Sequence, residues 1–360
     1  MALHFHTLRV KSVRPESDEA IVVSFDVPPE LAEQFRFTHG QHLTLRHTIG
    51  GNEERRSYSI CAAPADGELR VGVRKVPGGV FSTWLSETLR PGDTLQVMTP
   101  EGRFFVPLDR NAARHYLGVA GGSGITPILS ILKAVLGAEP KSTFTLIYGN
   151  RRQRSTMFTE ELEDLKNRYL SRLALHMVFS QEPVDLPLYS GRLDRTKIGE
   201  FLATLVDPEC IDHAFVCGPH GVNDEAEAAL RAAGVPAERI HIERFGIPNE
   251  SGPGRAPLQP ARAGDAADAR VTIIRDGIAR EIDFHAEQGN VLDAAAAAGL
   301  EVPFSCKSGV CCTCRAKLLE GEVRMERNFA LEKHEVAAGY VLTCQSHPLT
   351  GRVVLSFDER

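Results

Sequence analysis

The sequence lacks the features that would place it in a membrane, outside the cell or on nucleic acid. No apolar run among its 360 residues reaches the roughly 20 residues that a bilayer requires, because glycine, proline or charge interrupts each one. The N-terminus shows no basic region followed by an apolar core, so we expect no signal peptide. The net charge of −6 leaves no dominant basic surface. We therefore expect a cytoplasmic protein that binds neither membrane nor nucleic acid.

Length and cysteine content narrow the class further. A chain of 360 residues is too long for one ordinary core, so we expect two or three domains. The eight cysteines occur without an export signal. This combination favours a reducing compartment, in which thiols bind metal or carry redox chemistry instead of forming disulfides.

The clearest motif is a cysteine-rich loop near the C-terminus. Cys306, Cys311 and Cys314 share this loop, and Cys344 follows on a distant segment. The Cys-x4-Cys-x2-Cys…Cys spacing is that of a plant-type [2Fe–2S] cluster, whose sulfides need backbone N–H donors from a tightly wrapped loop. Gly309 is expected to remove the Cβ that would most obstruct the loop. Structural zinc and disulfides are weaker alternatives, because only one short Cys-x2-Cys pair is present and nothing indicates an oxidising compartment.

Cys312 falls inside the motif but does not fit its spacing. If Cys312 replaced Cys311 as a ligand, the two-residue gap to Cys314 would be lost. We therefore predict that Cys312 is a small buried side chain packed beside the cluster and is not a ligand.

Residues 1–108 are typical of short strands separated by turns. Runs rich in β-branched and aromatic residues occur at 5–10, 20–25, 41–45, 68–73 and 94–98. Six or so such strands predict a small antiparallel β-barrel.

Two stretches of this barrel carry candidate binding residues. Arg56-Ser57-Tyr58-Ser59 falls on a strand, so alternation points Arg56 and Tyr58 to one face and the two serines to the other. A Gly-Gly pair at 78–79 opens an amphipathic helix, and such a loop offers backbone N–H groups and a helix dipole to an anion such as a diphosphate. Each signal alone is also compatible with chance or with an ordinary turn.

Residues 109–246 alternate between apolar strands and helical segments. Strands are expected at 115–120, 143–148, 173–179 and 212–217, which predicts a doubly wound parallel sheet with helices on both faces. The loop after the first strand reads Gly-x-Gly-x-x-Pro and leads into a helix expected over 128–136.

The ends of two of these strands carry candidate ligand-binding residues. In the first loop, Thr126 would be the N-cap of the following helix and Pro127 its first residue. Cys217-Gly218-Pro219 follows the last strand, before a helix expected over 223–232. That edge is where such sheets bind ligands, although a buried structural cysteine is the alternative interpretation of Cys217.

The last part of the chain is predicted to be a linker and a small domain. Residues 247–269 are rich in proline, glycine, alanine and charge without periodicity, which is typical of a semi-rigid linker. In residues 270–360, Asp276-Gly277 between alternating strands is a strong hairpin signal. Asn290 would cap a helix over 291–298 that ends at Gly299, and a last strand is expected over 352–357.

Taken together, these motifs resemble the ferredoxin–NADP reductase superfamily followed by a plant-type ferredoxin. Arg-Ser-Tyr-Ser, the 78–82 loop, Gly-x-Gly-x-x-Pro and Cys-Gly-Pro occur in the order and at the domain-scale spacing of that superfamily. The resemblance covers nearly the whole chain outside the linker. It implies a flavin domain with an antiparallel β-barrel, a nucleotide domain with a doubly wound α/β fold, and a β-grasp (α+β) ferredoxin domain.

The resemblance also implies roles for the barrel residues. Arg56 would neutralise the diphosphate of FAD, Tyr58 would pack against the isoalloxazine, and the Ser59 hydroxyl would approach flavin N5. A second diphosphate-binding loop favours FAD over FMN. The other implied FAD-binding residues are Ser57, Gly78, Gly79, Val80, Phe81 and Ser82.

Further roles are implied for the nucleotide domain. Glu243 and Phe245 match the acidic-x-aromatic segment that covers the flavin in relatives. The expected catalytic residues are Ser59, Cys217 and Glu243. The residues implied to bind the nicotinamide nucleotide are Gly122, Gly124, Thr126, Pro127, Cys217, Gly218 and Pro219.

The basic segment after the second strand of this domain favours NADPH. Residues 149–155 read Gly-Asn-Arg-Arg-Gln-Arg-Ser and include no acidic residue to hold a free ribose 2′-hydroxyl. Arg151 is therefore predicted to bind a 2′-phosphate. A solvated basic loop at a helix start is the alternative.

The resemblance implies that the protein passes electrons from NADPH through FAD and the cluster to a separate oxygenase. The nucleotide surrenders two electrons as hydride, whereas an oxygenase metal centre accepts them singly. The ferredoxin segment is most similar to the reductase subunits of phenylacetyl-CoA epoxidases, which implies di-iron oxygenase subunits as partners in phenylacetate degradation. The reductase of another aromatic or steroid oxygenase, and a regulatory flavoprotein without turnover, are the alternatives.

Overall fold

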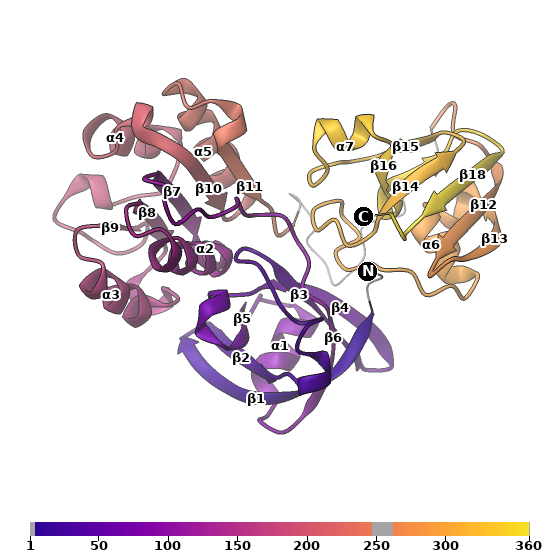
Figure 1. The fold of residues 1–360 in the computed structure, drawn as a ribbon, viewed down its shortest axis with the longest axis horizontal. Helices are drawn as coiled ribbons and strands as arrows, with labels where there is room; N and C mark the ends of the chain where they lie inside the picture. The colour runs from indigo at the N-terminus through magenta and orange to yellow at the C-terminus, as the bar shows by residue number, and fades with distance from the viewer. Residues whose placement is uncertain (1–3, 247–261, 360) are drawn as a thin grey trace. The chain divides into compact units, whose positions relative to one another are not determined.

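The computed structural model describes residues 4–246 and 262–359. Contacts divide the chain into two compact units, one made mainly of residues 6–245 and the other mainly of residues 246–360. The first unit contains a β-barrel and an α/β part, and the second has a small α+β fold (Figure 1). Within the described ranges, no helix is long and apolar enough to cross a bilayer.

The first six strands form one sheet that closes into a barrel. Its order is β4-β3-β6-β1-β2-β5, and the described β1–β2, β2–β5 and β3–β6 pairs are antiparallel. The barrel closes because Ile60, directly after β4, bridges Val71 of β5. Helix α1 (Val80–Glu87) lies against the barrel strands (Figure 1). The strands are β1 (Phe5–Ser17), β2 (Ala20–Asp26), β3 (His42–Ile49), β4 (Asn52–Ser59), β5 (Leu69–Arg74) and β6 (Thr94–Met98).

The α/β part is a five-stranded parallel sheet of order β11-β10-β7-β8-β9. The order reverses at β7, because β8 and β9 follow on one side and β10 and β11 on the other; ligands bind at such a switch point. The strands are β7 (His115–Gly121), β8 (Thr143–Asn150), β9 (Leu173–Phe179), β10 (Ile211–Cys217) and β11 (Ile240–Glu243). Only β11 was not predicted.

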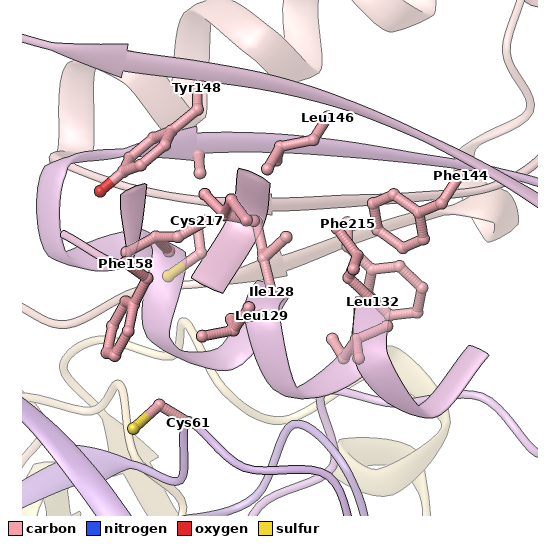
Figure 2. Packing of buried hydrophobic residues seen from close by; sticks show 14 of the residues in the cluster. Cys61, Ile128, Leu129, Leu132, Phe144, Leu146, Tyr148, Phe158, Phe215 and Cys217 are labelled. Atoms are coloured by element: carbon pink, nitrogen blue, oxygen red, sulfur yellow. The ribbon is translucent and has the colours of Figure 1, made fainter. Parts of the chain in front are cut away.

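Helices cover both faces of this sheet, as the alternating pattern predicts. Helices α2 (Ile125–Ala138) and α3 (Thr159–Arg168) share one core with the sheet, and α4 (Arg195–Thr204) and α5 (His220–Ala232) share the other. Figure 2 shows Ile128, Leu129 and Leu132 of α2 in the same cluster as aromatic side chains such as Phe144 and Phe215. Cys61, from the segment after β4, belongs to the same cluster. A continuous core therefore joins the barrel to the α/β part.

Two helices begin earlier than the sequence predicts. Helix α2 begins at Ile125 with Gly124 as N-cap, so the prediction that Thr126 caps it and Pro127 starts it is wrong. The reason is that residues 122–124 form a 3-10 turn that runs directly into α2. The Thr126 hydroxyl donates to the Ser123 carbonyl oxygen at 3.0 Å and does not accept a capping bond. Helix α5 begins at His220, directly after Pro219.

One face of β5 fastens the barrel to the α/β part. Arg70, Gly72 and Arg74 alternate along the strand and therefore share this face. Arg70 Nη2 donates to both carboxylate oxygens of Glu161, at 2.7 and 2.8 Å. A Cβ added to Gly72 would lie 2.7 Å from Thr126 Cγ2, so only glycine lets α2 approach this closely.

The second unit is a sheet of order β13-β12-β18-β14-β16, packed on helix α6 (Val291–Ala297). Asp276 and Gly277 have positive φ values of 54° and 73°, so the predicted hairpin is confirmed. The Asn290 side chain accepts the Asp293 N–H at 3.0 Å, which confirms the predicted cap. The remaining elements are β12 (Asp268–Arg275), β13 (Ile278–His285), β14 (Arg315–Glu320), β15 (Val323–Met325), α7 (Lys333–Ala337), β16 (Tyr340–Leu342), β17 (Ser346–Pro348) and β18 (Arg352–Ser356).

The linker predicted at 247–269 lies mostly outside the described residues, which resume at 262. The segment after this point is held within the second unit. Ala266 N–H donates to the Pro348 carbonyl oxygen at 2.9 Å, and Asp265 pairs with Arg324 at 2.6 Å. The proposed domain boundaries after residues 108, 246 and 269 remain predictions.

Leu132→Ala should lower the free energy of unfolding of the first unit by about 2–5 kcal/mol, because this side chain is fully buried and its truncation leaves a cavity. Leu170→Ala is the matched control, since Leu170 is 69% exposed; its effect should stay within about 0.5 kcal/mol. Urea unfolding followed by the fluorescence of Trp84, the only tryptophan in the sequence and a residue of the same unit, measures both. Equal effects in the two variants would contradict the assigned core.

Candidate active site and cluster loop

Two glycine loops meet at the carboxyl ends of β7 and β10. A Cβ added to Gly124 would lie 2.0 Å from the Cys217 carbonyl oxygen. One added to Gly121 would lie 2.8 Å from Pro219 Cδ, and one added to Gly218 would lie 3.1 Å from Gly121 Cα. Glycine is therefore required where the loops touch, and the starts of α2 and α5 are held together at the switch point of the sheet.

Gly122, predicted to bind the nucleotide, is fixed by a residue that the sequence analysis missed. Gly122 has a positive φ of 52°, and its carbonyl oxygen accepts the Tyr148 hydroxyl at 3.0 Å. That hydroxyl also accepts the Met157 N–H at 3.3 Å. Burial raises the pKa of Tyr148, so it stays a neutral donor. A tyrosine within an apolar strand gives no local signal of this role.

The three predicted catalytic residues come together in the first unit. Cys217 and Glu243 are register partners at the ends of β10 and β11. Ser59, the last residue of β4, donates its hydroxyl to Glu243 Oε2 at 3.3 Å. Asn223 of α5 holds the Glu243 backbone, because its Nδ2 donates to the Glu243 carbonyl oxygen at 3.0 Å. Asn223 was also missed by the sequence analysis.

Burial changes the acidity of this site. It raises the pKa of Glu243 to about 8, and the hydrogen bond from Ser59 only partly opposes the change. The carboxyl group is enclosed, although the residue as a whole keeps some exposed surface. Burial raises the pKa of Cys217 well above its usual value, and the nearby Glu243 adds a smaller effect in the same direction. At neutral pH the site therefore holds a protonated carboxyl and a neutral thiol.

Of the predicted flavin-binding residues of β4, Tyr58 lies near α1. The Tyr58 ring is 6.3 Å from the Phe81 ring, at an interplanar angle of 30°. Arg56 Nη1 donates to the Arg55 carbonyl oxygen at 2.7 Å. Ser57 lies two residues before Ser59 on β4, so the two side chains point to the same face of the strand.

The predicted phosphate loop leads into α1 as expected. Gly79 is the N-cap of α1, and Gly78 has a positive φ of 73°. The Ser82 hydroxyl accepts the Val76 N–H at 3.1 Å, so this side chain closes the loop from within. The first turn of the helix, which begins at Val80, carries N–H groups that a helix does not use internally.

The other residues predicted for this site lie at the following positions. Phe245 follows Glu243 by two residues and is 46% exposed. Pro127 lies in the first turn of α2, and Pro219 is the N-cap of α5. Arg151, after β8, pairs at 2.8 Å with Glu19, a residue of the β1–β2 turn that the sequence analysis missed.

The four predicted cluster ligands gather in the second unit as two pairs. The Cys306 and Cys311 thiols are hydrogen-bonded to each other, as are those of Cys314 and Cys344. Two irons that share four thiolates take two each, so adjacent pairs fit a [2Fe–2S] cluster. The described residues hold no set of three or more His, Cys, Asp or Glu gathered around a single ion.

Backbone donors surround one of these sulfurs. Ser308 N–H donates to Cys306 Sγ at 3.4 Å, and the Val310 N–H also bonds to it. The hydrogen bond from Cys311, with help from these groups, lowers the pKa of Cys306 to about 5, and the pKa of Cys311 is raised. N–H donors to the sulfurs are what an iron–sulfur cluster requires.

Gln345 holds the cluster loop, which the sequence analysis did not predict. Its Nε2 donates to the Lys307 carbonyl oxygen at 3.0 Å, and the side chain is buried. Gly309 has a positive φ of 78°, and a Cβ there would lie 3.2 Å from both the Arg327 carbonyl oxygen and Gln345 Cγ. The clash that Gly309 avoids is therefore with these two residues. The Cys312 thiol donates to the Ala330 carbonyl oxygen at 3.3 Å.

Three family models match the chain in succession. An oxidoreductase FAD-binding domain matches residues 7–106, and an oxidoreductase NAD-binding domain matches residues 119–227. A 2Fe-2S iron-sulfur cluster binding domain matches residues 273–349. The order is the one that the motifs predict.

Solved structures share the same fold. Phthalate dioxygenase reductase, described as a modular structure for electron transfer from pyridine nucleotides to [2Fe-2S], matches with a TM-score of 0.60 and 24% identity, over 98% of both chains. An intact type IV self-sufficient cytochrome P450 monooxygenase matches with a TM-score of 0.69 and 24% identity, over 98% of this chain and 41% of that one.

Two curated relatives align along nearly the whole chain. A component of the 1,2-phenylacetyl-CoA epoxidase of Escherichia coli strain K12 is 45% identical over 99% of this chain and 98% of its own. The ferredoxin reductase component of 3-ketosteroid-9-alpha-monooxygenase from Mycobacterium tuberculosis is 36% identical over 99% and 97%. The chain therefore belongs to the ferredoxin reductase-type family of these oxygenase components, and it is an NAD(P)H-dependent oxidoreductase with FAD and a [2Fe–2S] cluster.

Proposed function

We propose that this chain is the reductase of a multicomponent oxygenase that epoxidises phenylacetyl-CoA. It takes hydride from NADPH and delivers single electrons to separate di-iron oxygenase subunits. The observation that carries the proposal is the 45% identity, along 99% of the chain, with a component of phenylacetyl-CoA epoxidase. FAD and the cluster, when bound, supply the conversion of a two-electron hydride into single electrons.

The nicotinamide is assigned to the carboxyl edge of β7 and β10, beside Thr126, Cys217 and Gly218. Ser59 is the residue assigned to flavin N5, and Glu243 holds a proton next to its hydroxyl. The 3.3 Å contact between Ser59 and Glu243 supports this assignment, together with the register pairing of Cys217 with Glu243. The neutral Cys217 thiol contributes volume and excludes water; it is not a nucleophile.

The FAD diphosphate is assigned to Arg56 and to the N–H groups at the start of α1. Tyr58 is assigned to the isoalloxazine face, and Phe245 to the segment that covers it. The positive φ of Gly78 and the closure of the loop by Ser82 support a rigid anion-binding loop. The remaining assigned contacts come from Ser57, Gly79, Val80 and Phe81.

The cluster ligands are assigned to the four cysteines that form two adjacent pairs. These are Cys306, Cys311, Cys314 and Cys344. Cys312 is excluded, because its thiol is directed to the Ala330 carbonyl oxygen and its position breaks the motif spacing.

A reductase of a steroid oxygenase is the second candidate. The 36% identity with a 3-ketosteroid-9-alpha-monooxygenase component over 99% of this chain favours it. Reconstitution separates the two. NADPH, oxygen, phenylacetyl-CoA and the epoxidase subunits should give the ring epoxide only when this chain is added, as measured by mass spectrometry. Faster turnover with the steroid oxygenase would replace the first candidate with the second.

Cys306→Ser should lose the cluster and support no epoxide formation, yet keep NADPH-to-ferricyanide activity, because hydride transfer needs only the flavin. Cys312→Ser is the matched control from the same loop and should retain its iron. Iron analysis, ferricyanide reduction and epoxide yield check the three outcomes. If the cluster-free variant sustains epoxide formation, the electron route through the cluster is wrong.

Glu243→Gln should remove a pH dependence of stability. With a folded pKa of about 8, above the ordinary 4.5, the neutral carboxyl stabilises the fold below about pH 4.5, and this contribution is lost as the pH rises through 8. Between pH 6 and pH 8 the free energy of unfolding of the variant should therefore rise by about 1 kcal/mol relative to that of the wild type, after discount for residual exposure. Urea unfolding with Trp84 fluorescence measures it. Glu33→Gln, at an exposed surface pair, should show no such gain.

Arg151→Ala should lower kcat/KM for NADPH about tenfold or more and leave that for NADH within about threefold, because a charge-assisted bond to the 2′-phosphate is lost. Steady-state kinetics with both donors measures the ratio. Arg168→Ala removes an equal charge from the exposed end of α3 and serves as the control. Equal losses with both donors would exclude Arg151 as the 2′-phosphate ligand.

A further inference from the structure

The end of β1 and the turn that follows it carry acidic residues that contact the α/β part of the first unit. Glu16 Oε1 accepts the Phe158 N–H at 2.6 Å, and Asp18 lies 3.6 Å from Arg154 Nε. Both contacts fasten the turn to the segment that follows β8. The carboxylate of Glu19, directly before β2, is therefore not required to anchor the turn.

Glu19 binds two guanidinium groups at once. Arg151 Nη2 lies 2.8 Å from Glu19 Oε2, and Arg74 Nε lies 3.1 Å from the same oxygen. The hydrogen bond from Arg74 is the main reason that the pKa of Glu19 lies below its usual value, so the carboxylate is charged at neutral pH. The side chains of Glu19, Arg74 and Arg151 are 38%, 25% and 52% exposed, so a small anion can reach them.

The two arginines border the nucleotide site from different elements. A Cβ added to Gly122 would lie 2.7 Å from Arg74 Nη1, so Arg74 lies directly against the glycine loop after β7. Arg151 follows β8, the neighbouring strand. In such sheets the first loop faces the diphosphate and the end of the next strand faces the adenosine ribose. Nucleotide phosphates and Glu19 therefore require the same donors.

We propose that Glu19 is a specificity-determining residue, whose carboxylate is an internal anion that competes with nucleotide phosphates for Arg74 and Arg151. The inference rests on the proposed use of NADPH and names what limits that preference. A 2′-phosphate must displace Glu19 from Arg151 before it can form an ion pair with that guanidinium. NADH brings a 2′-hydroxyl and meets no such displacement. Glu19 thus narrows the difference in affinity between the two donors.

Glu19→Gln keeps the shape of the side chain and removes its charge. Calorimetry on the oxidised holoprotein measures binding of adenosine 2′,5′-bisphosphate and of 5′-AMP, which lacks the 2′-phosphate. The Kd of the bisphosphate should fall about three- to tenfold, the range that one or two partly exposed ion pairs support, and that of 5′-AMP should change less. Glu33→Gln removes an equal charge from the exposed pair with Arg36 and should change neither.

Three outcomes would overturn the proposal. An unchanged Kd for the bisphosphate in Glu19→Gln would mean that the carboxylate does not compete for the arginines. A higher Kd would mean that Glu19 positions them, because removal of a positioning residue weakens binding. An equal gain for both ligands would place the competition at the 5′-phosphate that both carry and remove the effect on specificity.

A double-mutant cycle with Arg151→Ala separates this proposal from the proposed donor. If Arg151→Ala does not raise the Kd of the bisphosphate, Arg151 is not the 2′-phosphate ligand and the proposed NADPH preference fails. The effect of Glu19→Gln is measured separately, with Arg151 present and with Arg151 replaced by alanine. The excess of the bisphosphate gain over the 5′-AMP gain from Glu19→Gln should disappear when Arg151 is already alanine, because Arg74 remains and acts on both ligands. An excess that persists in full would contradict competition for Arg151.

Discussion

The contact between two glycine loops at the carboxyl edge of the parallel sheet is the constraint on which the candidate active site depends. Gly124 lies against the Cys217 carbonyl oxygen, so the start of α2 is fixed relative to β10. Helix α2 in turn holds the barrel, because the Ser130 hydroxyl donates to the Ala62 carbonyl oxygen at 2.6 Å. The position of Ser59 beside Glu243 therefore follows from backbone packing that no side chain other than hydrogen would allow.

Local signals in the sequence predicted local structure well. Asp276-Gly277 turns a hairpin and Asn290 caps a helix, because in both cases the residue itself supplies the conformation or the hydrogen bond. The Thr126 cap failed because the glycine turn before it already continues into α2. Strand β11 was missed, since four residues give too short a pattern and only pairing with β10 defines it.

The sequence indicated the motifs of the candidate site but not the residues that hold those motifs in place. Cysteine spacing and the glycine loops carry information in consecutive residues, so they are visible in one sequence. Tyr148, Asn223 and Gln345 act through contacts with residues distant in the chain, and nothing in their own neighbourhood marks them. Glu19 is the clearest case, because its partner Arg151 lies 132 positions away.

Strand β5 has a consequence for modular engineering of this family. Its Arg70, Gly72 and Arg74 belong to the barrel by sequence, yet each contacts the α/β part or its glycine loop. A chimera joined at residue 108 would bring a foreign nucleotide domain to a docking surface tailored to the original one. A transplanted nucleotide domain should therefore be transferred together with its matching β5 face and β1–β2 turn. The exchangeable module is then defined by an interface and not by a stretch of chain.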